Sequence, residues 1–179
     1  MGRFGVTLLL LSLSVLFISS IIGFIVIRAR AEVWPPPGVP DLPAGLWLST
    51  LVIAASSAAM WRGQKAIAEG RRQALTTALL ITFLLGLMFL VNQTVNWFTY
   101  IARGIGTAAN LYAFGFYMLT GLHALHVIGG LVPLAITTAR ARRGAYSRAS
   151  HAGVVHMAMY WHFLGAIWLV LFVVIYLLG

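Results

Sequence analysis

Phe116-Tyr-Met-Leu-Thr-Gly-Leu-His-Ala-Leu-His-Val-Ile-Gly-Gly-Leu131 is the most informative stretch of this chain, because it is apolar enough to lie in a membrane and yet carries two histidines. His123 and His126 lie one helical turn apart within it. A second stretch near the C-terminus, Tyr160-Trp-His-Phe-Leu-Gly-Ala-Ile-Trp168, places His162 in a similar apolar run. Ionisable side chains are costly at bilayer depth, so they usually face the interior of a helix bundle or a partner. We therefore expect these two segments to pack against other helices.

The composition is that of a protein embedded in a membrane. Of 179 residues, 61% are hydrophobic and only 8% are charged, whereas soluble proteins average about 25% charged residues. The net charge of +9 would suggest nucleic-acid binding in a soluble protein, but the basic residues cluster in two short segments beside apolar runs. That placement indicates membrane topology and contact with anionic lipid, so no nucleic-acid partner is expected. The chain has no cysteine, which excludes a disulfide or a thiolate metal site.

Five apolar runs predict an all-α, polytopic membrane bundle that forms one transmembrane domain over residues 1–179. A transmembrane helix needs roughly 17–25 mainly apolar residues, and suitable runs occupy residues 4–27, 44–61, 75–97, 110–139 and 151–178. The first run is longer than the apolar part of a signal peptide, which has about 7–15 residues, so we expect a retained helix. The proline-rich segment 34–43 is predicted to be an extended, stiff connector.

The basic residues of the connecting segments predict how the bundle is oriented. The segments after the second and fourth runs each carry four Lys or Arg, whereas those after the first and third runs carry two and one. Because Lys and Arg accumulate on the cytoplasmic side, the N-terminus is predicted to lie inside and the C-terminus outside. Tryptophans and tyrosines near the ends of the runs fit an aromatic belt at the two membrane interfaces.

The embedded histidines allow two interpretations. His126 and His162, one from each of two helices, could ligate a b-type haem, which would make the chain a membrane redox anchor. Alternatively, neutral imidazoles form hydrogen bonds between the fourth and fifth helices, or with Thr120 or Tyr160. All three acidic residues lie in the connecting segments, so no carboxylate is available at depth to orient an imidazole. We therefore favour hydrogen bonding and expect no metal site, and no proton pathway through this chain alone.

The same stretches resemble the last two helices of cytochrome c oxidase subunit III and its relatives in quinol oxidases. The matches to the family's penultimate helix are Phe116-Tyr117, Leu119-Thr-Gly121 and His123-x-x-His126-Val127. The matches to its last helix are Tyr160-Trp-His-Phe163, Trp168 and Ile175-Tyr-x-x-Gly179. Upstream matches are Trp34-Pro-Pro-x-Gly38, Leu85-Gly86, Phe89 and Gln93. The resemblance therefore covers nearly the whole chain.

The chain departs from this family in two respects. Many members have seven spans, whereas this chain resembles a five-span form that lacks the first two. The phospholipid cleft that those two helices make would be absent or built by another subunit. In addition, Leu13, Asn96 and Gly165 stand where the family tends to have an acidic residue. A proton-related role of those carboxylates is therefore not carried over to this chain.

The resemblance implies a non-catalytic accessory subunit of a haem–copper terminal oxidase in aerobic respiration, in the plasma (inner) membrane of a prokaryote. In such complexes subunit I carries the haems and the copper, and subunit III binds its flank with phospholipid between them. The partners would be subunit I, other subunits of the respiratory complex and membrane lipids. No catalytic, cofactor-binding or metal-binding residue and no small-molecule substrate is then expected in this chain. The residues expected to make helix-packing, partner or lipid contacts are Thr120, His123, His126, Tyr160, Trp161, His162 and Trp168.

Two further points concern the class of protein. A small transporter is a third interpretation, but the chain shows no inverted repeat and no pair of interrupted helices at matching positions. Within the oxidase interpretation, either cytochrome c or quinol is compatible as the electron donor, because the donor site would lie on other chains.

Overall fold

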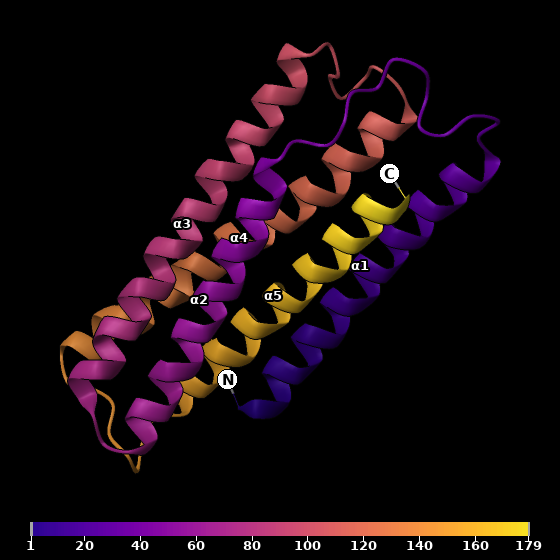
Figure 1. The fold of residues 1–179 in the computed structure, drawn as a ribbon. Coiled ribbons are helices and arrows are strands. Elements are labelled where there is room, and N and C mark those ends of the chain that lie inside the picture. Colours follow the sequence, from indigo (N-terminus) through magenta and orange to yellow (C-terminus); the bar gives the residue numbers. More distant parts are fainter. Residues whose placement is uncertain (1, 179) are drawn as a thin grey trace.

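The computed structural model describes residues 2–178, and the regular elements within that range are all α-helices. They are α1 (Arg3–Arg30), α2 (Gly45–Ala68), α3 (Arg72–Ala102), α4 (Leu111–Arg142) and α5 (Ala152–Leu178). The five helices lie side by side along one direction and form a bundle (Figure 1). The predicted all-α class is confirmed.

Four of the helices, α1, α3, α4 and α5, are long and apolar enough to cross a membrane. Helix α2 is not among them; its sequence contains Ser49, Thr50, Ser56 and Ser57, and Arg62 and Lys65 lie toward its end. It nevertheless has 24 residues, and at 1.5 Å per residue its length is about 36 Å. That exceeds the hydrocarbon thickness of a bilayer, which is roughly 30 Å.

The helices extend beyond several of the predicted apolar runs. The second run was expected to end at residue 61, whereas α2 continues to Ala68 and includes Arg62 and Lys65. The third run was expected over 75–97, whereas α3 covers Arg72–Ala102. The difference arises because hydropathy marks only the part of a helix that suits lipid. Ala, Lys, Arg and Gln favour helix, so the backbone continues past the first charges.

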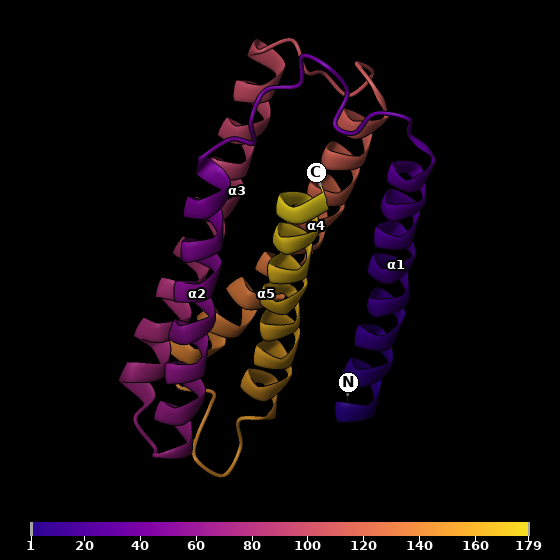
Figure 2. The same cartoon turned by 45° about the vertical axis from the view of Figure 1, so that its right-hand side comes forward.

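The connections alternate between the two ends of the bundle. The α2–α3 and α4–α5 connections lie at the same end as the N-terminus, and the α1–α2 and α3–α4 connections lie at the other end (Figures 1 and 2). Helices α2 and α3 form the most extensive pair, and α5 contacts α1, α2 and α4. Among the helices of residues 2–178, α1 contacts only α4 and α5, and Figure 2 shows it at the edge of the bundle.

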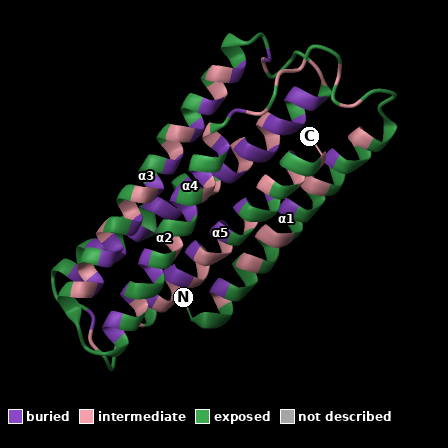
Figure 3. Ribbon diagram, in the orientation of Figure 1, coloured by how far each residue is buried: buried purple, intermediate pink, exposed green. Residues whose placement is uncertain are grey.

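Buried and exposed side chains are segregated as in a membrane bundle. The buried residues lie mainly on the facing sides of the helices (Figure 3), and the largest of them include Trp161, Trp168 and Phe89, each less than 2% exposed. The outer surface is also apolar: Leu51 is 68% and Val91 is 65% exposed. Such a surface suits lipid, because lipid tails are as apolar as leucine.

The proline-rich connector between α1 and α2 packs on the end of the bundle. Trp34 donates a hydrogen bond from Nε1 to the carbonyl oxygen of Leu178, at 2.6 Å. The Tyr100 hydroxyl donates to the carbonyl oxygen of Pro40, at 3.0 Å. These bonds join the connector to α5 and α3, so it is held against the helix ends.

Candidate helix-packing and partner-contact site

Three motif side chains of α5 are paired with hydroxyl groups of α2. The pairs are Trp161 Nε1 with Ser56 Oγ at 3.0 Å, Trp168 Nε1 with Thr50 Oγ1 at 3.0 Å, and His162 Nδ1 with Ser57 Oγ at 2.6 Å. An indole N–H can only donate, and lipid offers it no acceptor. The hydroxyl groups of α2 therefore provide hydrogen-bond partners for ring nitrogens of α5, which would cost free energy if they were left unpaired in lipid. We call these six side chains the α2–α5 seam.

The partner of His162 differs from the one expected. We predicted hydrogen bonds between the fourth and fifth helices or with Thr120 or Tyr160, whereas His162 is bonded to Ser57 of α2. The reason is the position of α5, which contacts α2 on one side and α4 on another. His162 lies on the side that faces α2.

Trp161 also reaches α3, and a glycine makes room for it. A Cβ atom added at Gly86 would lie 2.8 Å from the indole of Trp161 and 2.9 Å from the side chain of Leu131. Real Cβ atoms essentially never approach other atoms so closely. Gly86 thus allows the side chains of Leu131 on α4 and Trp161 on α5 to pack closely against α3.

His123 lies where four helices meet. It is fully buried on α4, and its ring centroid is 5.4 Å from that of Phe89 on α3, 5.2 Å from that of Trp168 on α5 and 6.3 Å from that of Phe17 on α1. Aromatic rings at these separations attract one another. Within residues 2–178, neither ring nitrogen of His123 has a hydrogen-bond partner. Burying an imidazole without hydrogen-bond partners costs free energy. The position of His123 therefore destabilises the fold by that amount, against the attraction of the surrounding rings.

The end of α3 carries further amides, of which Gln93 and Asn96 are buried and Asn92 is half-buried. Asn92 Nδ2 donates to the Gly45 carbonyl oxygen and to Ser49 Oγ, both at 2.7 Å. Asn96 packs so closely on Gly45 that no Cβ would fit there. Among the described residues, however, Asn96 Nδ2 and both amide atoms of Gln93 have no hydrogen-bond partner. Contact between α2 and α3 at this end thus depends on a glycine and two asparagines.

Thr120 connects α4 to α3. Its hydroxyl accepts a hydrogen bond from Trp97 Nε1 at 3.0 Å and donates one to the carbonyl oxygen of Phe116 at 2.8 Å. One turn before Thr120, the Tyr117 hydroxyl donates to the carbonyl oxygen of Ile105 at 2.7 Å. These bonds fix the start of α4 against the end of α3.

His126 and Tyr160 connect α4 to α5 through the backbone. The Tyr160 hydroxyl donates to the carbonyl oxygen of His126 at 3.0 Å. His126 Nδ1 lies 2.7 Å from the carbonyl oxygen of Leu122. A carbonyl oxygen can only accept, so Nδ1 is the donor in this contact.

His126 and His162 line different grooves. His126 and Leu13 line a groove of about 520 Å³ between α1, α4 and α5. His162, Ser57 and Gly165 line a groove of about 570 Å³ between α2 and α5. Two axial ligands must face one haem, so this arrangement does not support ligation by this pair. Within the described residues, no group of three or more His, Cys, Asp or Glu is placed to hold a metal ion.

The three positions where the resemblance leads us to expect an acidic residue lie beside these features. Leu13 lies in the groove of His126 and Gly165 in the groove of His162, whereas Asn96 is buried against Gly45. A Cβ at Gly165 would lie 3.9 Å from Ser57 Oγ, so the backbone there leaves room for a side chain. These three positions therefore belong to different parts of the bundle.

Sequence reasoning did not identify the hydroxyl groups of α2 as partners of the motif. Thr50, Ser56 and Ser57 were not among the candidate residues. A signal was present, because Thr50 and Ser57 are seven residues apart and such residues share one helical face. What the sequence does not state is which helix that face contacts.

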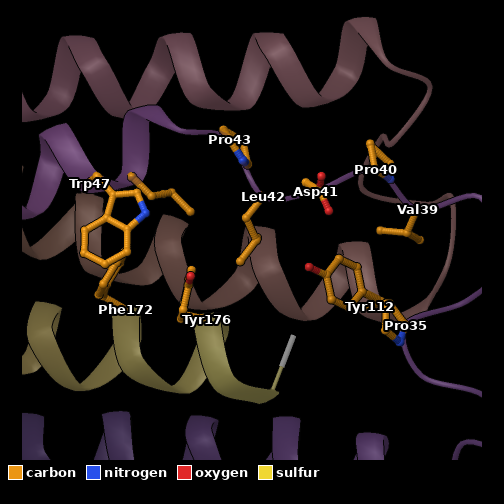
Figure 4. Close-up of a pocket in the computed structure, with 11 residues that line it drawn as sticks. Pro35, Val39, Pro40, Asp41, Leu42, Pro43, Trp47, Tyr112, Phe172 and Tyr176 are labelled. Carbon is orange, nitrogen blue, oxygen red and sulfur yellow. The ribbon is translucent and has the colours of Figure 1, made fainter.

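A separate cavity lies under the proline-rich connector. It has a volume of about 330 Å³ and is lined by the connector together with Trp47 of α2, Tyr112 of α4, and Phe172 and Tyr176 of α5 (Figure 4). The Trp47 ring lies 4.8 Å from that of Phe172 and 5.5 Å from that of Tyr176. Asp41 is the one acidic residue among those lining the cavity. The aromatic cluster joins the ends of α2 and α5 at this side.

These observations define an all-helical bundle with several helices apolar enough for a membrane, in which motif side chains contact neighbouring helices. Comparison with known proteins then identifies the family. Residues 2–179 match the family described as cytochrome c oxidase subunit III. The chain belongs to that family.

Individual relatives cover nearly the whole chain. It is 38% identical to a cytochrome c oxidase subunit 3 of Synechocystis sp., over 98% of this chain and 75% of the relative. It is 33% identical to the cytochrome c oxidase subunit 3 of Thermostichus vulcanus, over 97% and 86%. It is also 33% identical to a probable cytochrome c oxidase subunit 3 of Mycobacterium bovis, over 95% and 85%. The resemblance inferred from the two C-terminal motifs is thus confirmed.

Proposed function

We propose that this chain is a non-catalytic accessory subunit of a haem–copper terminal oxidase in the plasma membrane of a prokaryote. It stabilises the catalytic subunit I, which carries the haems and the copper, and it binds lipid where the two subunits meet. The observation that carries this proposal is the family match over residues 2–179. The arrangement of the motif supports it, because Thr120, Tyr160 and Trp161 form hydrogen bonds to neighbouring helices.

The seven motif residues act, in this proposal, through packing. Trp161 and Trp168 hold α5 on α2, Thr120 holds α4 on α3, and Tyr160 holds α5 on α4. The remaining three are the histidines, of which two line grooves that open on the outer surface. Lipid or the partner subunit occupies those grooves, and the packed helices present a fixed surface to subunit I.

All five helices cross the membrane in this proposal, with the N-terminus inside and the C-terminus outside. Its support is the length of α2 and its position against α3 and α5. The two most basic segments, residues 62–72 and 140–148, lie at one end of the bundle (Figure 2), as expected for the cytoplasmic side.

The absence of cysteine allows a direct test of this orientation. Ala149→Cys lies in the α4–α5 connection and Thr107→Cys in the α3–α4 connection, and both positions are exposed. In intact cells, a membrane-impermeant maleimide should label the Thr107→Cys variant and spare the Ala149→Cys variant until the membrane is opened. The reverse labelling would overturn the proposed orientation.

The test of the function itself is purification through a tag on this chain in mild detergent. We expect a large haem- and copper-containing subunit to co-purify, together with other oxidase subunits. When that subunit is stripped away, all visible colour should leave with it, and this chain should be colourless. Retention of a reduced b-type band by this chain alone would contradict the proposal and restore the haem-anchor hypothesis.

A further inference from the structure

The groove between α2 and α3 at the basic end of the bundle is lined by several cations and by apolar side chains. Its volume is about 1160 Å³, and both helices contribute to its lining. Its charged lining residues are Arg62, Lys65, Glu69, Arg71 and Arg72. The apolar part is formed by small and aliphatic side chains from the adjoining turns of the same helices.

The charged part of the groove has a clear excess of positive charge. Four cations face one acid, and Glu69 is already paired with Arg71. Arg62, Lys65 and Arg72 are exposed, so they are available to an anion. Helix α3 begins here without an acidic residue in its first turn, so its N–H groups add to the positive potential. A phosphate group complements this end of the groove.

The apolar part of the groove is shaped for a hydrocarbon chain. Ala55, Ala59 and Ala78 form a floor of small side chains, with Ile81 and Leu85 at its far end. It therefore continues from the cations toward the middle of α2 and α3, the direction in which a lipid tail runs from its head group.

An aromatic ring marks the boundary between the two parts. Trp61 is 56% exposed, and Lys65 Nζ lies 5.6 Å from the centre of its ring. Tryptophan favours the level of the lipid head groups, and a cation over its face is held by the ring quadrupole. Trp61 thus places Lys65 at the depth of a phosphate.

We propose that this groove binds one anionic phospholipid, with its phosphate among Arg62, Lys65 and Arg72 and an acyl chain along the alanine floor. Basic pockets between transmembrane helices bind such head groups in general. The site differs from the subunit-interface lipid of the proposed function. It needs α2 and α3 to lie in a membrane, but it does not depend on membership of an oxidase complex.

The test measures the apparent dissociation constant of added lipid by native mass spectrometry. The complex that this chain forms is purified, delipidated in detergent, and titrated with dioleoylphosphatidylglycerol or dioleoylphosphatidylcholine. The variant Arg62→Gln/Lys65→Gln/Arg72→Gln should bind the phosphatidylglycerol about 100-fold more weakly, at roughly fivefold for each charge removed. Its binding of phosphatidylcholine should change little.

The matched control removes the same charge from another place. Arg140→Gln/Arg142→Gln/Arg143→Gln lies at the end of α4, where all three side chains are exposed, and it should retain phosphatidylglycerol binding within about threefold. Equal loss in both triple variants would show non-specific attraction and overturn the proposal. Equal affinity of the unchanged protein for the two lipids would overturn it too.

A further variant separates the acyl chain from the head group. Ala55→Phe fills the exposed part of the alanine floor, so it should weaken dioleoylphosphatidylglycerol binding and spare binding of the short-chain dihexanoyl lipid. Inorganic phosphate should compete poorly in either case. Full competition by phosphate, or exclusion of lipid from the groove by a co-purifying subunit, would contradict the proposal. Co-purification of subunit I is scored separately, so the two proposals succeed or fail independently.

Discussion

The α2–α5 seam and helix α1 show two different ways of holding a helix in this bundle. In the seam, hydroxyl groups of α2 pair with ring nitrogens of α5 between helices. The hydroxyl groups of α1 are used within the helix itself: Ser12, Ser14 and Ser20 each donate to the carbonyl oxygen four residues earlier. Hydroxyl groups of α2 therefore help to determine which helix packs against it, whereas the hydroxyl groups of Ser12, Ser14 and Ser20 in α1 do not.

Burial follows the same division. Of the 28 residues of α1, only Val6, Phe17 and Phe24 are buried, whereas the seam includes two indoles that are each 1% exposed. Side-chain packing and hydrogen bonds, rather than hydrophobicity, hold helices together in a membrane. We therefore expect changes in the seam to destabilise the bundle as a whole, and changes at the α1 contact to loosen α1 alone.

The largest effect is expected from Trp161→Ala. It removes a buried indole that packs against Gly86 and donates a hydrogen bond to Ser56. Truncating a buried tryptophan costs about 3–5 kcal/mol, so the free energy of unfolding in detergent should fall by that amount. Circular dichroism during denaturation measures it. The matched control is Trp61→Ala, whose ring is 56% exposed. Equal losses in the two variants would show that the seam contributes no more than a lipid-facing side chain.

A smaller and more local effect is expected from Gly115→Ala. A Cβ at this position of α4 would lie 2.5 Å from the ring of Phe24, one of the buried residues of α1. Overpacking typically costs about 1–3 kcal/mol, and the displaced group here belongs to α1. Amide hydrogen exchange should therefore rise in α1 and stay unchanged in α2 and α5.

The control for that experiment is another glycine of the same helix. A Cβ at Gly121 would meet nothing within 4 Å, so Gly121→Ala should leave exchange in α1 unchanged. Faster exchange in α2 and α5 of the Gly115→Ala variant would show that α1 is coupled to the seam, against the separate behaviour expected of the two regions.

The sequence predicted the helices of both regions but not their neighbours. Long apolar runs can be recognised directly in the sequence. His162 within such a run indicates a contact with another helix, because burial of an imidazole in lipid costs free energy. The identity of Ser57 as its partner depends on how α5 is placed between α2 and α4, which no spacing within a single helix contains. The closeness of Asn96 to Gly45 has the same origin.

The predicted spans are shorter than the helices that contain them, for a related reason. An apolar run ends at the first charged residues, whereas the helix ends where the backbone stops favouring helix. In α2 the apolar run ends at residue 61 and the helix continues to Ala68. The candidate residues were all taken from the two C-terminal motifs, which lie on α4 and α5. Those motifs include Thr120, Trp161 and Trp168, but no residue of α2, so its serine and threonine partners were missed.

The hydrogen bond of His162 should have a moderate effect. His162→Leu leaves the Ser57 hydroxyl without its partner, and loss of one such bond costs about 0.5–1.5 kcal/mol. We expect weaker packing of α5 on α2 and weaker association with the catalytic subunit, with the haem and copper content of the purified oxidase unchanged. Ser57→Ala removes the same bond from the other side and should cost a similar amount. Loss of a haem or of copper after His162→Leu would contradict a packing role.

The smallest effect concerns the bond between Trp168 and Thr50 taken by itself. Trp168→Phe removes the N–H group and Thr50→Val removes the hydroxyl, so a double-mutant cycle isolates their interaction from the packing lost in each variant. The coupling should be about 0.6 kcal/mol, the average found between membrane helices. It is modest because Thr50 also donates to the carbonyl oxygen of Leu46 at 2.9 Å, and that bond is present whether or not the indole is. A coupling near zero would mean that packing of the rings, rather than this hydrogen bond, stabilises the seam. The hydroxyl groups would then serve only to avoid leaving indole N–H groups unpaired.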